Sequence, residues 1–225
     1  MWCRLVPGEY ALAVYISHPT LAHSQCLLTH SHPGAIVGTC LLAGMVWWAL
    51  RLGQVAPEQP RQRQELMLDK LHQVLKQSLA ITQLRDDSYT ERCERLASLL
   101  EQEPAPSGWL VARALGTGIP AVDSVPAAIF SFLICLLPDQ ASETQQTPTP
   151  LDTPLVRSLM YAISLGGDTD TIGSMCGALA GAYYGNGGLP DHLSQSFEGY
   201  TDAVSMADDL YDIFKANHPE LAVDS

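Results

Sequence analysis

Apolar residues recur at helical spacing along much of the chain. Between residues 64 and 84 they follow one another at three- and four-residue steps, as one face of an α-helix requires: Leu66, Met67, Leu71, Val74, Leu75 and Leu79. Residues 88–102 and residues 204–214 show the same amphipathic pattern. Almost no stretch alternates with a period of two, the pattern of a half-buried strand. The periodicity therefore predicts an all-α chain.

Other segments are apolar with few polar interruptions, which predicts buried helices. The pair His18-Pro19 separates an apolar run at residues 10–15 from a second run at residues 20–28. We expect Pro33 to open a long helix, because proline is tolerated in the first turn and not in the interior.

The C-terminal half continues this organisation. Residues 109–137 contain a glycine-rich break, GTGIP, after which an apolar helix is expected from Val125-Pro126. Residues 155–165 and 171–185 are predicted helices separated by Gly166-Gly167.

Polar segments without periodicity divide these helices. Residues 53–63 and residues 138–153 are expected to be loops because they combine proline with polar residues. No internal repeat is visible, so we expect residues 1–225 to form a single domain in which residues 1–19 are the least well assigned.

Composition limits the class of protein. The 225 residues are 47% apolar and 16% charged, a balance that excludes a natively unfolded chain for most of the length. The formal net charge is −12, so we expect no direct binding to nucleic acid, which requires a basic surface. An acidic chain suits metal ions or cationic ligands, although solubility alone also accounts for it.

The cysteines indicate the compartment. None of the six cysteines forms a C-x-x-C pair, and four lie in apolar runs, which favours buried, reduced thiols in an intracellular protein. We expect a cytoplasmic location, with the nucleus or an organelle as alternatives. The N-terminus does not resemble a signal peptide, because Pro7, Gly8 and Glu9 interrupt its apolar stretch.

A membrane protein is one alternative that the hydropathy pattern leaves open. Residues 31–50 are twenty residues without a charge, long enough to span a bilayer. Two further uncharged segments, residues 124–138 and 172–190, share a high content of small residues, and no basic clusters flank the three segments. These features favour buried helices of a large helical core, and we expect no membrane association.

The stretch from Ser164 to Gly173, SLGGDTDTIG, carries the most specific chemistry. Paired glycines allow a sharp turn, after which Asp168 or Thr169 can cap the next helix. At a helix start, the carboxylates of Asp168 and Asp170 and the Thr171 hydroxyl can converge on one point. Clustered hard oxygen atoms are the ligands that Mg²⁺ or Ca²⁺ requires. The alternative interpretation is an acidic first turn that complements the helix dipole.

The helix that follows is unusually rich in small residues. Residues 173–185 contain repeated glycine, alanine and serine, which allows neighbouring helices to pack closely against it. We interpret this run as a packing surface rather than a phosphate-binding loop.

Three segments together resemble the ADP-ribosylglycohydrolase family. GGDTDTIGSMCGALAGAYYG resembles its C-terminal signature, LLTHSHPGAIVGTCLLAGMVWWAL its Thr-His-x-x-Pro-x-Ala-Ile helix, and GTGIPAVDSVPAAIFSFL its Gly-x-Gly segment followed by Ser-Val-Pro-x-Ala-Ile. The resemblance covers most of residues 20–215 and is weakest in 52–108. The sequences of these motifs are most similar to those of family members that act on serine-linked ADP-ribose and poly(ADP-ribose).

This resemblance implies an all-α fold with two Mg²⁺ ions in a central cleft. Asp168, Asp170 and Thr171 match metal ligands, and the two aspartates also match catalytic positions. Gly118 and Ile119 match the segment that lines the ADP-ribose cleft.

Other positions match the family less closely. His30 matches a histidine near the ligand, with a buried histidine bonded to a backbone carbonyl as the alternative; for His32 we favour a structural role. Thr117 stands where the family often has Asn, and Asp123 where it often has Glu.

The chain also departs from the family pattern. The Thr-Asp-Asp-type motif that supplies the other half of the metal site, and the phosphate-binding glycine loop after it, do not occur in the sequence. We therefore expect an N-terminally truncated domain that binds Mg²⁺ weakly at best.

The predicted function follows from the resemblance. We expect a Mg²⁺-dependent hydrolase that cleaves the glycosidic bond of ADP-ribose on protein, of the serine type, or in poly(ADP-ribose). ADP-ribosylated protein or the polymer is then the partner, while the oligomeric state stays open. The alternative is a catalytically inactive fragment or pseudoenzyme that retains an ADP-ribose-binding helical module.

Overall fold

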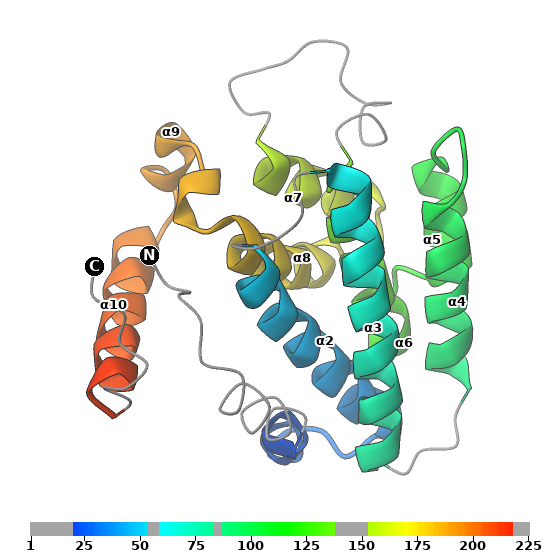
Figure 1. Ribbon diagram of the computed structural model, residues 1–225, viewed down its shortest axis with the longest axis horizontal. Helices are drawn as coiled ribbons and strands as arrows, with labels where there is room; N and C mark the ends of the chain where they lie inside the picture. Colours follow the sequence, from blue (N-terminus) through cyan, green and yellow to red (C-terminus); the bar gives the residue numbers. More distant parts are fainter. Residues whose placement is uncertain (1–19, 54–58, 83–86, 138–152, 218–225) are drawn as a thin grey trace.

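The structure, a computed structural model, describes residues 20–53, 59–82, 87–137 and 153–217. Every regular element within these ranges is helical, which confirms the all-α prediction (Figure 1). Residues 20–26 form a short helix, and the predicted run at residues 10–15 lies outside the described residues. The helices that follow are α2 (Pro33–Leu52), α3 (Pro60–Thr82), α4 (Ser88–Leu100), α5 (Gly108–Leu115), α6 (Ala121–Ile134), α7 (Pro154–Ser164), α8 (Thr169–Tyr184), the 3₁₀ turn η2 (Asn186–Gly188), α9 (Asp191–Ser194) and α10 (Tyr200–Asn217).

Helix α6 forms the centre of the core. Its side chains from Ser124 to Ile134 are all buried, and it packs against α2, α3, α4, α5, α7 and α8. The helix begins at Ala121, earlier than the start predicted at Val125-Pro126. The reason is Pro120, whose carbonyl accepts the N–H groups of Asp123 and Ser124 and so starts the helix ahead of the internal proline.

Helix α3 also begins earlier than its apolar pattern predicted. Pro60 opens it, as proline does in a first turn, within the segment predicted to be a loop. The residues of this added turn are exposed or half-buried and none is a large apolar residue, so no apolar periodicity marks them. Helix α10 likewise extends beyond the predicted 204–214, and its apolar residues Met206, Leu210 and Ile213 are exposed.

Helix α2 is the segment whose apolar character suggested a membrane span. By length and composition it could cross a bilayer, yet half of its most apolar window is buried inside the fold. It contacts α3, α6 and α8, as expected for a core helix. Its start was predicted at Pro33 and is confirmed.

Helix α8 packs closely on its neighbours through its small residues. The position of a Cβ on Gly177 lies 3.2 Å from Leu159 Cδ2 of α7, which is tighter than ordinary contact. The prediction of a packing surface is therefore confirmed at Gly177, while Gly181 of the same run has nothing within 4 Å of a Cβ. The predicted burial of reduced thiols is also confirmed for the five cysteines in the described residues, Cys26, Cys40, Cys93, Cys135 and Cys176.

Substituting two glycines is expected to change stability in opposite directions. A Cβ on Gly53, at the end of α2, lies 2.0 Å from the Tyr183 carbonyl oxygen, so Gly53→Ala forces the ends of α2 and α8 apart at a cost of about 1–3 kcal/mol. Gly181, inside α8, has nothing within 4 Å of that position, so Gly181→Ala stabilises by about 0.5–1 kcal/mol through helix propensity. Urea unfolding of both variants measures these changes, and equal effects would contradict the packing described for Gly53.

Candidate functional site

The turn between α7 and α8 is built from two consecutive glycines in the left-handed region. Gly166 has φ +75° and Gly167 has φ +74°, values that side chains bearing a Cβ rarely adopt. The chain thereby leaves α7 at Ser164 and re-enters a helix at Thr169 within a few residues. The predicted break at these glycines is confirmed.

This turn docks on a second glycine-containing loop, residues 116–120. The Asp168 N–H donates to the Thr117 carbonyl oxygen at 2.8 Å. A Cβ on Gly167 would lie 2.1 Å from the same oxygen, so only glycine permits this approach. The structure therefore brings together two of the three segments on which the family resemblance depends, although about fifty residues separate them in the chain.

The carboxyl groups of Asp168 and Asp170 lie together at the start of α8. A hydrogen bond with the Asp168 side chain, followed by bonds from the backbone N–H groups of Thr171 and of Asp170 itself, lowers the pKa of Asp170 below its usual range. The Thr171 N–H reaches Asp170 Oδ1 at 3.0 Å. Asp168 occupies the position before the first helical residue but makes no capping bond with its side chain. The cap expected from Asp168 or Thr169 is therefore absent: Thr169 is already the first helical residue, and the Asp168 carboxyl group interacts with Asp170 instead.

These side chains can supply part of a metal site. Asp168 is half-buried, Asp170 and Thr171 are exposed, and their carboxylate and hydroxyl oxygens are the donors that Mg²⁺ accepts. In the described ranges, the start of α8 included, no group of three His, Cys, Asp or Glu side chains gathers to hold a metal ion. The fit is therefore to a partial ligand set.

The loop at residues 116–120 presents the predicted ligand-lining residues beside this carboxyl pair. Gly118 is half-buried, while Ile119 is 83% exposed. An exposed apolar side chain next to two carboxyl groups offers a ligand one apolar and one polar contact surface. Their role in binding stays a prediction.

The start of α2 lies against the start of α6, which brings the third segment to the same end of the bundle. The Tyr89 hydroxyl donates to the Gly34 carbonyl oxygen at 2.9 Å. A Cβ on Gly38 would lie 3.1 Å from Ala121 Cβ and 3.3 Å from Val125 Cγ2. The starts of α2 and α6 are thus neighbours, and the loop before α6 contacts the start of α8.

The two histidines before α2 differ in their contacts. His30 is exposed and its Nδ1 shares a hydrogen bond of 2.8 Å with Thr29 Oγ1, so the alternative of a buried histidine is wrong. His32 is also exposed; its Nδ1 accepts the Gly34 N–H at 3.1 Å and caps α2, a structural role. Among the described residues, His30 forms no hydrogen bond with Asp168 or Asp170.

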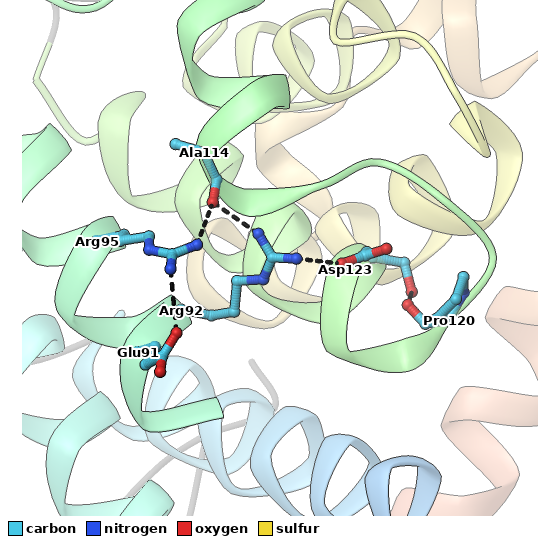
Figure 2. A network of polar contacts seen from close by, with 7 residues as sticks. Glu91, Arg92, Arg95, Ala114, Pro120 and Asp123 are labelled. Carbon is cyan, nitrogen blue, oxygen red and sulfur yellow. Dashed lines mark hydrogen bonds and ion pairs between the residues drawn. The ribbon is translucent and has the colours of Figure 1, made fainter. Parts of the chain in front are cut away.

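Arg92 is a residue of this region that sequence analysis did not identify. Its Nη2 pairs with Asp123 Oδ1 at 2.7 Å, and its Nη1 donates to the Ala114 carbonyl oxygen at 2.7 Å (Figure 2). Arg92 lies in the part of the chain where the family resemblance is weakest. Its helical position predicts only an exposed face, and nothing in the local pattern indicates its partner 31 residues later.

Comparisons with known proteins place the chain in a family. Residues 7–220 match the family model described as ADP-ribosylglycohydrolase. The chain is 42% identical to "ADP-ribosylhydrolase ARH3" of Bos taurus over 132 residues, which is 59% of this chain and 34% of that protein. It is 34% identical to the protein of that name from Xenopus tropicalis over 202 residues, 86% of this chain and 53% of that protein. The chain thus spans between a third and about half of the length of these relatives.

Alanine substitutions at Gly166 and Gly167 are expected to distinguish two costs in stability: the backbone strain of a positive φ, and the loss of the close contact between Gly167 and Thr117. Gly166 and Gly167 have nearly the same φ, so Ala costs about 1–2 kcal/mol at either position. Only Gly167 lies against Thr117, whereas nothing is within 4 Å of a Cβ on Gly166. Gly167→Ala should therefore cost about 1–3 kcal/mol more than Gly166→Ala. Chemical denaturation measures both, and equal losses would contradict the docking.

The pKa of Asp170 is expected to depend on Asp168. Asp168→Ala removes the largest cause of the lowered pKa, so the pKa of Asp170 should rise, while Thr171→Ala keeps the backbone N–H and should leave it unchanged. Because folding lowers this pKa, the carboxylate stabilises the fold above the unfolded-state pKa, and this contribution disappears as the pH falls through the folded-state value. Carbon-13 NMR titration of the metal-free protein measures the shift. An unaltered pKa in Asp168→Ala would contradict the contact.

Proposed function

The chain belongs to the ADP-ribosylglycohydrolase family, and from this membership we propose that it forms part of an ADP-ribosyl hydrolase that cleaves the glycosidic bond of ADP-ribose on protein. The observation that carries the proposal is the hydrogen bond between Asp168 N–H and the Thr117 carbonyl oxygen. It unites the carboxyl pair with the loop that bears Gly118 and Ile119 at one place on the surface.

We propose Asp168, Asp170 and Thr171 as ligands of Mg²⁺, of which the complete family site holds two ions. The adjacent carboxyl groups and the exposed position of Asp170 and Thr171 support this assignment. Mg²⁺ bound there supplies positive charge that orients ribose hydroxyl groups and water. With three ligands from this chain, and with Mg²⁺ giving up its water reluctantly, we expect weak affinity.

The protein side chains contribute their own chemistry. Cleavage of a glycosidic bond passes through an oxocarbenium-like state whose positive charge a nearby carboxylate stabilises. The carboxylates of Asp168 and Asp170 are placed to supply that negative charge, and either can accept the proton released by the attacking water. The lowered pKa of Asp170 supports its ionised form at neutral pH.

We propose serine-linked ADP-ribose, or the poly(ADP-ribose) chain, as the substrate. The similarity to proteins named ADP-ribosylhydrolase ARH3 supports a substrate that carries ADP-ribose. The resemblance of the motifs described above supports the serine-linked or polymeric type. In this proposal the exposed side chains of Ile119 and His30 contact the ligand beside the carboxyl pair. The buried thiols, which form no disulfide among the described residues, and the net charge of −12 support an intracellular, cytoplasmic protein that does not bind nucleic acid directly.

A catalytically inactive ADP-ribose-binding module is the second candidate. It is favoured by the partial ligand set, since the described residues bring two carboxyl groups together rather than three or more. Such a module would bind ADP-ribose through the loop at residues 116–120 without turnover.

Release of ADP-ribose from a serine-ADP-ribosylated peptide in the presence of Mg²⁺ tests the proposal. Asp168→Asn and Asp170→Asn should each lower turnover about a hundredfold or more, the scale expected for loss of a catalytic carboxylate. Asp209→Asn makes the same change at an exposed position of α10 and should leave turnover unchanged.

Calorimetry with ADP-ribose distinguishes the two candidates. Binding without turnover in the folded protein would support the inactive module and overturn the hydrolase proposal for this chain. Absence of both binding and turnover would overturn both candidates.

A further inference from the structure

We propose that Arg92 is a positioning residue for the ADP-ribose site: through Asp123 it holds the loop at residues 116–120, and through Thr117 of that loop it fixes the start of α8. The inference rests on the proposed function only for the identity of the ligand. The mechanical part of the proposal concerns contacts within the free protein.

The first step is the link that Arg92 makes between three helices. From α4 its guanidinium group reaches the Ala114 carbonyl oxygen, near the end of α5, and Asp123 Oδ1, in the first turn of α6, both at 2.7 Å (Figure 2). The planar guanidinium offers two N–H groups in fixed directions, so one side chain holds both acceptors at once. The chain enters the loop after Ala114 and leaves it before Asp123, so both ends of the loop are fixed by one residue.

The second step is the close contact between Asp123 and the loop itself. A Cβ on Gly116 would lie 2.5 Å from both Cγ and Oδ1 of Asp123, and one on Gly118 would lie 3.4 Å from its Oδ2. Gly116 has φ +82°, so the loop turns sharply over the carboxylate. The position of the carboxylate therefore determines the path of the loop, and Arg92 determines the position of the carboxylate.

The third step connects the loop to the carboxyl pair. Thr117 lies between these two glycines, and its carbonyl oxygen accepts the Asp168 N–H at 2.8 Å. A Cβ on Gly167 would lie 2.1 Å from that oxygen, so the two backbones have no room to slide. A displacement of the loop is thereby transmitted to the first residue of the proposed metal site.

Partial burial gives the ion pair its strength. The side chains of Arg92 and Asp123 are 22% and 23% exposed, so solvent screens their interaction less than that of a surface pair. Arg95, one turn along α4, provides a natural comparison: it donates to the same Ala114 oxygen at 3.4 Å and pairs with Glu91 at 3.0 Å, with side chains 50% and 60% exposed. Arg95 has no contact with Asp123 among those that the structure gives, so it lacks the link to the loop.

Amide hydrogen exchange of the free protein, compared between Arg92→Gln and Arg95→Gln, tests this chain of contacts. We expect Arg92→Gln to speed exchange about tenfold in peptides covering residues 115–122 and 166–172, the factor that loss of a charge-assisted hydrogen bond gives. A peptide from the middle of α3 reports general stability and should be unchanged. Arg95→Gln should alter none of the three segments.

The ligand provides a second readout. By calorimetry, ADP-ribose should bind about tenfold more weakly to Arg92→Gln and with unchanged affinity to Arg95→Gln. Asp123→Asn, which keeps the size of the side chain and removes its charge, should act in the same direction. If Arg92→Gln does not fold, hydrogen exchange of Asp123→Asn takes the place of the Arg92→Gln measurement.

The outcomes separate this inference from the proposed function. A wild-type protein that does not bind ADP-ribose overturns the function, while the exchange data still decide the role of Arg92. Faster exchange in residues 115–122 without any change in 166–172 overturns the transmission to α8. Equal effects of the two arginine variants, or an equal rise in the α3 peptide, overturn a positioning role.

Discussion

The hydrogen bond from Asp168 N–H to the Thr117 carbonyl oxygen is the contact on which the proposed site depends. It joins two loops that approach so closely that Gly167 has no room for a side chain against the Thr117 carbonyl oxygen. Main-chain groups, the Asp168 N–H and the Thr117 carbonyl, thus hold the start of α8 in place. A hydrogen bond between main-chain groups does not depend on the side chain at position 117, so it does not require a threonine there.

The fold supports that contact by directing helix starts to one end of the bundle. Helix α6 is buried along eleven consecutive residues and aligns its neighbours, so the starts of α2 and α6 lie side by side and the loop before α6 meets α8. Helix starts carry free N–H groups and the positive end of the helix dipole, which favours carboxylates such as Asp170. The same geometry explains why Pro33 and Pro120 stand at or before the first residues of α2 and α6.

Charge is distributed in keeping with this arrangement. The chain has twice as many acidic as basic residues, 24 against 12. One of its few basic residues, Arg92, forms a partly buried ion pair with Asp123, next to the loop at residues 116–120. A partly buried ion pair loses hydration on both groups and is maintained only where geometry satisfies it, as the two acceptors of Arg92 do. The carboxyl pair at Asp168 and Asp170, in contrast, lies toward solvent, where a ligand or cation can reach it.

The sequence by itself determined the helical class, the positions of most helices, the burial of the cysteines and the turn at Gly166-Gly167, because each depends on neighbours in the chain. It misplaced the starts of α3 and α6, where a proline sets the boundary without an apolar signal. It also predicted a cap from Asp168 or Thr169, which the structure lacks because the Asp168 side chain interacts with Asp170. Only the tertiary structure decided that Thr117 meets Asp168 and that Arg92 pairs with Asp123. Those contacts join residues on different helices, and their distances follow from how the whole core packs rather than from any local pattern.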